Sequence, residues 1–251
     1  VKVPSAAQGE EKVKLTSEMG AANQAVAQIL DNAQYEDSFR GSEFPAFKKL
    51  DKVWFDDALP DGANRQGTLW EFVGAPDHPV FSGKNSTTRT GEGITQHFFT
   101  GAKDPFAIGK EDILFAYVFL DPDNPPETVQ LQFNDGQWEH RATWGADKCF
   151  GAGRDYEGNR RKGDLPEKGK WVRLEVSASE VGLKPGAKLN GWAFTQFGGT
   201  VHWDKAGSVG ASRLSPEQQE SLAIWEHYHR TVGGTLPKNI KTIVGVAVAE
   251  R

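Results

Sequence analysis

The sequence predicts a mainly β protein, an antiparallel β-sandwich with helical extensions at its N- and C-terminal ends. Through the middle of the chain, short apolar or alternating segments recur between turns that are rich in glycine and proline. The segment ILFAYVFL at 113–120 is apolar on both faces, as is typical of a strand at the centre of a two-layer structure. KWVRLEV at 170–176 alternates, so Val172, Leu174 and Val176 should share one buried face.

The chain divides into three zones. We expect a helical N-terminal extension or linker at 1–49, the sandwich domain at 50–207 and a helical C-terminal extension or linker at 208–251. In the first zone, apolar residues recur at helical spacing after possible caps at Thr16 and Ser17. These apolar residues are Met19, Ala22, Val26, Ile29 and Leu30.

Within the sandwich zone, QLQFNDGQWEHRATW at 130–144 predicts two strands joined at Asp135-Gly136, a pair that two-residue type I′ turns favour. Strand side chains alternate between faces. One face should carry Val129, Leu131, Phe133, Trp138, His140 and Trp144. The other should carry Gln130, Gln132, Glu139, Arg141 and Thr143. Packing both inward would bury a charged pair, so we expect the aromatic face in the core and the polar face in solvent.

A second hairpin is predicted where WAFTQF and TVHWD flank Gly198-Gly199. Trp192 and Trp203 would then share a face, which we interpret as core rather than as a platform for sugars. The opposite face would carry His202 and Asp204.

The last zone contains SPEQ at 215–218, a capping box with proline at the first helical position. A helix from this point would place Leu222, Trp225 and Tyr228 on one side. It should end near Gly233-Gly234.

The bulk properties exclude several classes of protein. A net charge of −5 and a pI near 5.7 argue against a nucleic-acid surface, which needs a clustered basic face. The single cysteine, Cys149, excludes an internal disulfide, a thiolate metal cluster and covalent haem attachment within this chain. The longest apolar run is too short to span a bilayer. The chain begins at Val1 without a signal-peptide pattern, so we infer a processed or excised piece of a longer protein.

The polar hairpin face suits oligosaccharide recognition. Sugar hydroxyls both donate and accept hydrogen bonds, so amide, carboxylate and guanidinium groups can bind them in pairs, while aromatic rings pack on apolar sugar faces. The predicted ligand-binding residues are Gln130, Gln132, Glu139, Arg141, Trp144 and His202. The candidate exposed rings are Trp54, Trp70, Phe81, His97, Phe98, Trp144 and Tyr156. The alternative interpretation is the ordinary solvated face of a sandwich.

Metal binding and catalysis have weaker signals. Asp56, Asp57 and Asp204 offer the hard oxygen ligands that suit a structural Ca²⁺, although their spacing matches no regular calcium loop. The sequence has no G-x-S-x-G, no glycine-rich phosphate loop and no H-E-x-x-H. We therefore lean towards a protein that is not an enzyme.

Several phrases of the sequence carry a resemblance to a known kind of module. They are KVWFDDALPDGA (52–63), APDHPVFSGKNS (75–86), QHFFTGA (96–102), the segment 114–145 and the segment 171–207. They resemble a module of large secreted planctomycete proteins that also carry cytochrome-c-like domains. The tail from 215 to 251 resembles the linker that leads to the next domain of such proteins. The resemblance implies a non-catalytic jelly-roll module in an extracellular, cell-surface or periplasmic setting, with any haem in other domains.

The segment 171–207 is also similar to the closing strands of many jelly-roll carbohydrate-binding modules. In those modules an aspartate near the end of the last strand often helps to hold a structural calcium, and Asp204 matches that position loosely. Three hypotheses follow: a polysaccharide-binding module, a structural spacer that docks other domains of the parent chain, and a polysaccharide hydrolase or lyase that uses Glu139 with Arg141 or His140.

Overall fold

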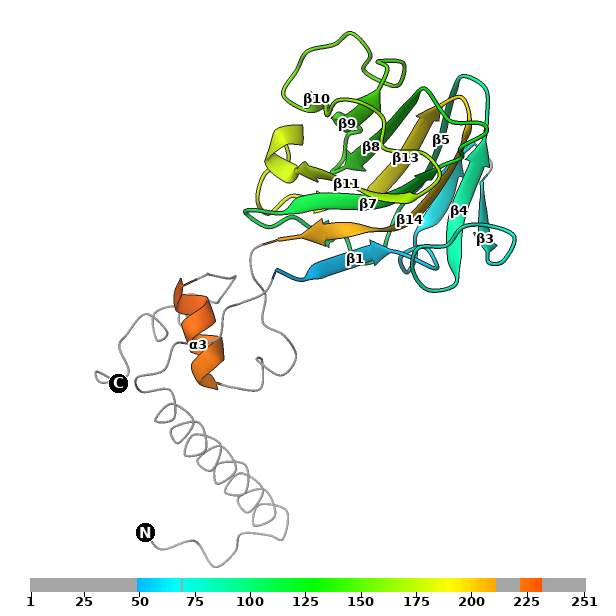
Figure 1. The fold of residues 1–251 in the computed structure, drawn as a ribbon. Coiled ribbons are helices and arrows are strands. Elements are labelled where there is room, and N and C mark those ends of the chain that lie inside the picture. The colour runs from blue at the N-terminus through cyan, green and yellow to red at the C-terminus, as the bar shows by residue number, and fades with distance from the viewer. Residues whose placement is uncertain (1–48, 69, 211–221, 232–251) are drawn as a thin grey trace, which may run out of the picture. The chain divides into compact units, whose positions relative to one another are not determined.

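The structure is a computed structural model that describes residues 49–68, 70–210 and 222–231. Lys49–Ala211 form one compact unit. This unit is a β-sandwich of two six-stranded sheets, which confirms the predicted fold class (Figure 1). The helix expected within 1–49 lies outside the described residues, as does the predicted start of the C-terminal helix.

We call one of the two the front sheet. Its strands, in spatial order, are β10 (Asn159–Arg161), β9 (His140–Gly145), β8 (Thr128–Asn134), β13 (Gly191–Phe197), β5 (Ile94–Thr100) and β2 (Asn64–Gly67). Neighbours in this sheet run antiparallel, except that β10 runs parallel to β9. The central strands β8 and β13 are buried on both faces.

The back sheet contains the remaining long strands. They are β11 (Trp171–Ser177), β7 (Ile113–Leu120), β14 (Thr200–Val209), β4 (Asn85–Thr90) and β3 (Glu71–Gly74), with β1 (Asp51–Phe55) paired to the second half of β14. The partner of β14 changes from β4 to β1 at an irregularity around Lys205, which has a positive φ of 38°.

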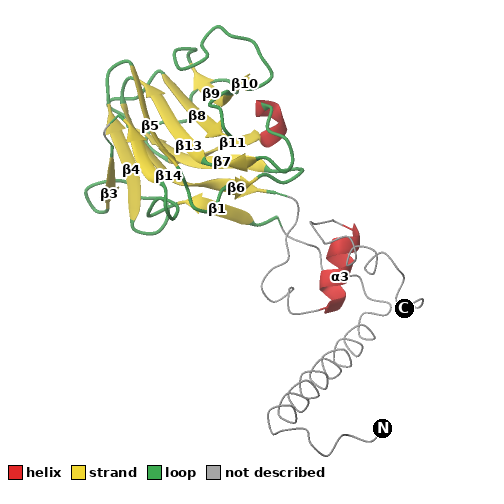
Figure 2. Ribbon diagram, turned by 180° about the vertical axis from the view of Figure 1, so that it is seen from behind, coloured by secondary structure: helices red, strands yellow, loops and turns green. Residues whose placement is uncertain are grey.

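Short elements complete the unit. They are the two-stranded sheet of β6 (Phe106–Ala107) with β12 (Lys188–Leu189) and the 3₁₀ helix η1 (Ala178–Val181). Figure 2 shows β6 beside β1, where the Lys52 ammonium donates to the carbonyl of Ala107 at 3.4 Å. The helix α3 (Leu222–Thr231) lies outside the unit and confirms a helix in the C-terminal zone.

Large apolar side chains fill the space between the sheets. Trp192 and Trp203 are fully buried there, as predicted. The predicted hairpin at Gly198-Gly199 is wrong, because β13 pairs within the front sheet and β14 within the back sheet. Both glycines adopt positive φ near 70°, and a Cβ on Gly199 would lie 2.4 Å from the backbone nitrogen of Pro126. The tight turn therefore carries the chain from one layer to the other.

Two buried histidines make the stability of this fold depend on pH. The His97 ring stacks on Trp70 with 4.8 Å between ring centroids. Burial lowers the pKa of His97 to about 3, and burial likewise lowers the pKa of His202 to about 4. In the unfolded chain both should take up protons near their usual pKa of about 6.5. The unfolded state therefore binds more protons below about pH 6.5, and the free energy of unfolding should fall as the solution is acidified.

We expect the urea concentration at the unfolding midpoint to decrease as the pH is lowered from about 7 to about 4.5. The decrease should be smaller in His97→Phe, because phenylalanine cannot take up a proton at this position. Asp204 opposes part of this trend, because burial raises its pKa to about 6 and the folded state then gains a proton between about pH 6 and 4. Urea titrations at several pH values measure the difference. An equal loss in both proteins would show that His97 does not control it.

Candidate functional site

The hairpin of β8 and β9 determines which side chains face outwards. Phe133 pairs with His140, and Gln132 pairs with Arg141. The connection therefore spans the five residues 135–139, where the sequence predicted a two-residue turn. The register differs from the predicted one by two positions. An even shift returns each side chain to its original face, so the two predicted faces of the strands are preserved.

The inward face is mostly as predicted. Val129, Leu131 and Phe133 are completely buried in the core. Trp144 also lies in this core with 7% of its surface exposed. This corrects the expectation that its ring contacts a ligand, because Trp144 pairs with Val129 on the inward face. Of the other candidate rings, Trp70 and His97 are buried as well.

Trp138 is not in the core. The longer connection removes it from the strand pairing and leaves it half-buried. Its ring contacts Phe98 of β5 edge to face, with 5.3 Å between centroids. The predicted core position of Trp138 is therefore wrong, and the residue lies on the outward face of the front sheet.

The outward polar face was predicted to be open to solvent, and this prediction is wrong for most of its residues. Gln130, Gln132 and Arg141 expose 1%, 2% and 6% of their surfaces. They are covered by the connection 135–139 and by the segment 146–158, whose backbone and side chains bond to them. Glu139, in contrast, is exposed as predicted. We call Gln96, Gln130, Gln132, Thr143 and Thr195 together with Arg141 the polar layer.

Two glutamines of the polar layer hold the backbone of two aromatic residues. Gln132 Nε2 donates to the carbonyl of Trp138 at 3.2 Å, and Gln130 Nε2 donates to the carbonyl of Phe150 at 2.8 Å. Gln96 Nε2 donates to Gln132 Oε1 at 2.5 Å, which sets the orientation of that amide. These glutamines are therefore placed to position rings rather than to contact a ligand themselves.

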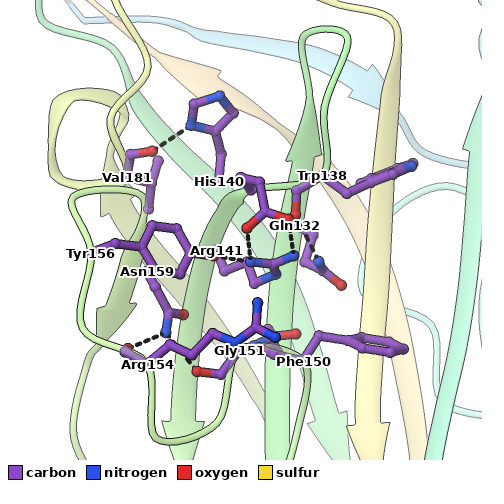
Figure 3. A network of polar contacts seen from close by, with 12 residues as sticks. Gln132, Trp138, His140, Arg141, Phe150, Gly151, Arg154, Tyr156, Asn159 and Val181 are labelled. Atoms are coloured by element: carbon purple, nitrogen blue, oxygen red, sulfur yellow. Dashed lines mark hydrogen bonds and ion pairs between the residues drawn. The ribbon is translucent and has the colours of Figure 1, made fainter.

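Arg141 and Asn159 fix the segment 146–158 in the same way (Figure 3). The Arg141 guanidinium donates to both carboxylate oxygens of Glu139, at 2.8 and 3.0 Å, and to the hydroxyl of Tyr156. Asn159 Nδ2 donates to the carbonyl of Arg154 at 2.8 Å. The backbone nitrogen of Arg141 also donates to the carbonyl of Gly158. We call the segment 146–158 the cover. Hydrogen bonds at several points along the cover join it to strands β9 and β10.

The rings above this layer form what we call the ring platform, made of Phe98, Trp138 and Phe150. Phe150 exposes 41% of its surface. Figure 3 shows the rings of Trp138 and Phe150 projecting on the same side of the network. Gly191 of β13 lies beneath Trp138, and a Cβ there would be 3.2 Å from Trp138 Cη2. A glycine at this position therefore lets the indole lie close to the sheet.

Sequence reasoning missed Trp138 and Phe150 as members of a site. The available signal was their place in segments rich in turn residues, where an aromatic side chain has no strand partner. Two buried atoms of the polar layer, Gln130 Oε1 and Arg141 Nε, have no hydrogen-bond partner within the described residues. This layer therefore keeps hydrogen-bonding capacity beneath the rings.

His202 does not join this site. It lies on β14 of the back sheet, 4% exposed, with its ring near those of His78 and Phe119. The sequence grouped it with Gln130 and Arg141, and the structure separates them because Gly198-Gly199 joins two sheets. His202 is corrected to a residue of the opposite sheet.

The three aspartates predicted as calcium ligands lie around residues 81–85. Asp204 Oδ2 accepts from the backbone nitrogens of Phe81 and Ser82 at 2.8 and 3.0 Å. Asp57 Oδ1 accepts from those of Lys84 and Asn85 at 2.6 and 2.7 Å, and these bonds lower the pKa of Asp57. The carboxylates therefore anchor this loop to the turn that follows β1 and to β14.

Asp56 contacts the same loop through a side chain rather than through the backbone. Its Oδ2 accepts from the Ser82 hydroxyl at 3.2 Å, while its buried Oδ1 has no partner among the described residues. Within the part of the chain that the structure describes, no three histidine, cysteine, aspartate or glutamate side chains form a group able to hold a metal. Asp56 and Asp204 interact directly, since burial and the Asp56 carboxyl both raise the pKa of Asp204, and they form a carboxylate pair rather than a complete ligand set.

Comparison with known proteins gives similarity of fold only. No protein-family profile matches the chain. No curated protein matches it either. Fifty-eight solved chains show a similar structure.

Three of these solved structures are carbohydrate-binding modules. TmCBM61, solved with β-1,4-galactotriose, is 9% identical with a TM-score of 0.35, over 60% of this chain and 89% of that one. The family 29 module CBM29-2 is 12% identical with a TM-score of 0.37, over 72% and 97%. The CBM22-1 xylan-binding domain of Paenibacillus barcinonensis Xyn10C is 14% identical with a TM-score of 0.37, over 65% and 97%.

The helices in the described residues are all too short or too polar to cross a bilayer.

Cys149, in the segment 146–158, is buried, and burial raises the pKa of its thiol to about 12. A thiol of this kind stays protonated at neutral pH and is a poor nucleophile.

Proposed function

We propose that the domain binds a polysaccharide chain, without cleaving it, on the ring platform of the front sheet. The observation that supports this most is the pair of buried glutamines, Gln130 and Gln132, each of which holds the backbone of one platform aromatic. Because the two buried amides hold the backbone of half-buried Trp138 and exposed Phe150, two large apolar rings stay at a fixed place on the surface. Exposed aromatic groups of this kind mark binding surfaces.

The chemistry of the platform suits sugars. The apolar face of a sugar ring packs on an aromatic ring. Glu139 and Arg154, both exposed beside the platform, offer an acceptor and a set of donors to sugar hydroxyls. The predicted ligand residues Gln130, Gln132 and Arg141 act, in this proposal, by positioning the residues that touch the ligand.

Affinity electrophoresis tests the proposal directly. The domain is run through gels that contain xylan, mixed-linkage β-glucan, galactan or alginate, with bovine serum albumin as a non-binding reference. We expect at least one neutral polysaccharide to retard it. Migration equal to that of the reference in every gel would contradict the proposal.

Catalysis is the weaker alternative for the same face. The hydrolase hypothesis used Glu139 with Arg141 or His140. Both Glu139 carboxylate oxygens accept from Arg141, and His140 Nδ1 lies 2.6 Å from the carbonyl of Val181. Glu139 is thus paired with a guanidinium and His140 with a backbone carbonyl, which favours binding over cleavage.

From the sequence resemblance alone, we propose that the parent chain is an exported bacterial protein, which is extracellular, at the cell surface or periplasmic. In that parent chain this domain accompanies others, such as cytochrome-c-like domains. The resemblance makes those other domains its partners within the parent chain.

A structural calcium remains a prediction, now centred on Asp56 and Asp204. Asp56 Oδ1 is an unused buried oxygen, and burial beside Asp56 raises the pKa of Asp204. A bound divalent cation would offset the repulsion between two neighbouring carboxylates. We expect added CaCl₂ to raise the melting temperature at neutral pH, and to do so less in Asp56→Asn. Identical melting curves in CaCl₂ and in EDTA would contradict the prediction.

A further inference from the structure

A cavity is lined by residues of β1, by Phe106 of β6 and by the loops at 60–61 and 104–105. The strands β1 and β6 lie side by side (Figure 2). The cavity's volume of about 390 Å³ is within the range of small-ligand pockets, roughly 300–1,000 Å³. Its apolar walls come from Trp54, Pro60, Pro105 and Phe106. Trp54 is only partly buried, although it packs against Phe106 with 5.2 Å between centroids.

Charged groups of both signs line the same cavity. Asp61 and Asp104 are exposed at its rim. The Lys52 ammonium lies 4.1 Å from the centroid of the Phe106 ring. The Lys52 ammonium occupies the face of the Phe106 ring where a cationic ligand would bind, and it would repel that ligand. The Asp61 and Asp104 carboxylates would repel an anionic ligand. A neutral ligand that carries hydroxyl groups and one apolar face fits both the charges and the indole.

The two loops that wall the cavity are bonded to each other. The backbone nitrogen of Lys103 in the second loop donates to the carbonyl of Asp61 in the first at 2.8 Å. Within the first loop, the backbone nitrogen of Ala63 donates to the carbonyl of Pro60 at 3.0 Å. Gly62 turns the first loop with a φ of 76°, and a Cβ there would lie 3.2 Å from Lys103. A ligand therefore enters a cavity whose shape is already set, which lowers the entropic cost of binding.

Two successive residues of β5 separate this cavity from the ring platform. Phe98 faces outwards and contacts Trp138. Phe99 faces inwards, is fully buried, and contacts Trp54 with 5.1 Å between centroids. The two aromatic sites thus lie on opposite sides of one strand, and Trp54 and Trp138 contact different residues of it.

We propose that the cavity is a second binding site, for the terminal sugar unit of an oligosaccharide. Trp54 packs on the apolar face of that unit, while Asp61 and Asp104 accept hydrogen bonds from its hydroxyls. The lining comes from three short segments, β1, residues 60–61 and residues 104–106, and a compact depression of this kind suits a chain end better than a long extended chain. The ligand class rests on the proposed function, but no residue is shared with the platform.

Titrations followed by NMR test this proposal, with cellohexaose, xylohexaose and β-1,4-galactotriose as probes. The indole N–H signals of Trp54 and Trp138 report on the two sites separately. We expect at least one probe to shift the Trp54 signal in the native protein and in Trp138→Ala. Asp61→Ala should weaken that binding about tenfold, while Asp77→Ala, an exposed aspartate outside the cavity, should not change it.

The two proposals fail in different ways. A Trp54 signal that no probe shifts, or an Asp61→Ala protein that binds as tightly as the native one, overturns the cavity site. A Trp138 signal that stays still while the Trp54 signal shifts leaves the cavity site in place and removes the platform. Asp61→Ala alters an exposed side chain only, so the variant should fold as the native protein does.

Discussion

Trp138→Ala is expected to weaken polysaccharide binding at least tenfold, which corresponds to about 1.4 kcal/mol, and Phe150→Ala to have a similar effect. Each change removes an aromatic surface while the glutamine that holds its backbone stays in place. Trp138 is half-buried, so its loss should cost about 1–2 kcal/mol of stability, less than the 3–5 kcal/mol typical of a buried tryptophan. Isothermal titration with the polysaccharide that retards the native protein, together with urea unfolding, measures both quantities.

Phe81→Ala is the matched control for Phe150→Ala. Both phenylalanines expose 41% of their surface. Phe81 stacks on Tyr117 of the back sheet with 3.6 Å between centroids, and its backbone nitrogen donates to Asp204 of the same sheet, whereas the polar layer belongs to the front sheet. Binding should therefore survive Phe81→Ala within about twofold. Equal losses in the two variants would mean that binding follows exposed apolar surface in general and that the platform has no special role.

The alternation of side chains along β8 and β9 was predictable from sequence because the period of a strand is a property of the backbone. It placed Leu131 and Phe133 inside and Gln130 and Gln132 on the other face, as the structure shows. The length of the connection was not predictable in the same way. Asn134 Oδ1 accepts from the backbone nitrogen of Gly136 at 2.8 Å, so a side chain competes with the two-residue turn.

The cover over the polar face was beyond local reasoning. Gln130 bonds to Phe150 and Arg141 to Tyr156 across 20 and 15 residues of sequence, through a segment with no alternating pattern. Polar strands under such a cover have the same composition as polar strands in solvent. The alternation therefore assigned Gln130, Gln132 and Arg141 to the face of the sheet that carries the proposed platform. In the proposal their roles are reversed, because the amides become supports and Trp138, a predicted core residue, becomes a ring of the platform.

Arg141→Ala is expected to lower the free energy of unfolding by about 2–3 kcal/mol, because it removes a buried guanidinium that joins β9 to Glu139 and Tyr156. The penalty stays below that of a fully buried ion pair, since half of the Glu139 side chain is exposed and its carboxylate remains hydrated. The segment 146–158 should also become more sensitive to protease. Urea unfolding and limited proteolysis followed by mass spectrometry measure the two effects.

Arg161→Ala separates this role from the general effect of removing an arginine nearby. Arg161 lies on β10 and pairs with Asp147 at 3.7 Å, but 54% of its side chain is exposed. An exposed pair of this kind contributes little, so its loss should cost no more than about 1 kcal/mol. If Arg141→Ala costs no more than Arg161→Ala, the guanidinium does not hold the cover. If the cover opens and polysaccharide binding persists, Phe150 does not belong to the platform.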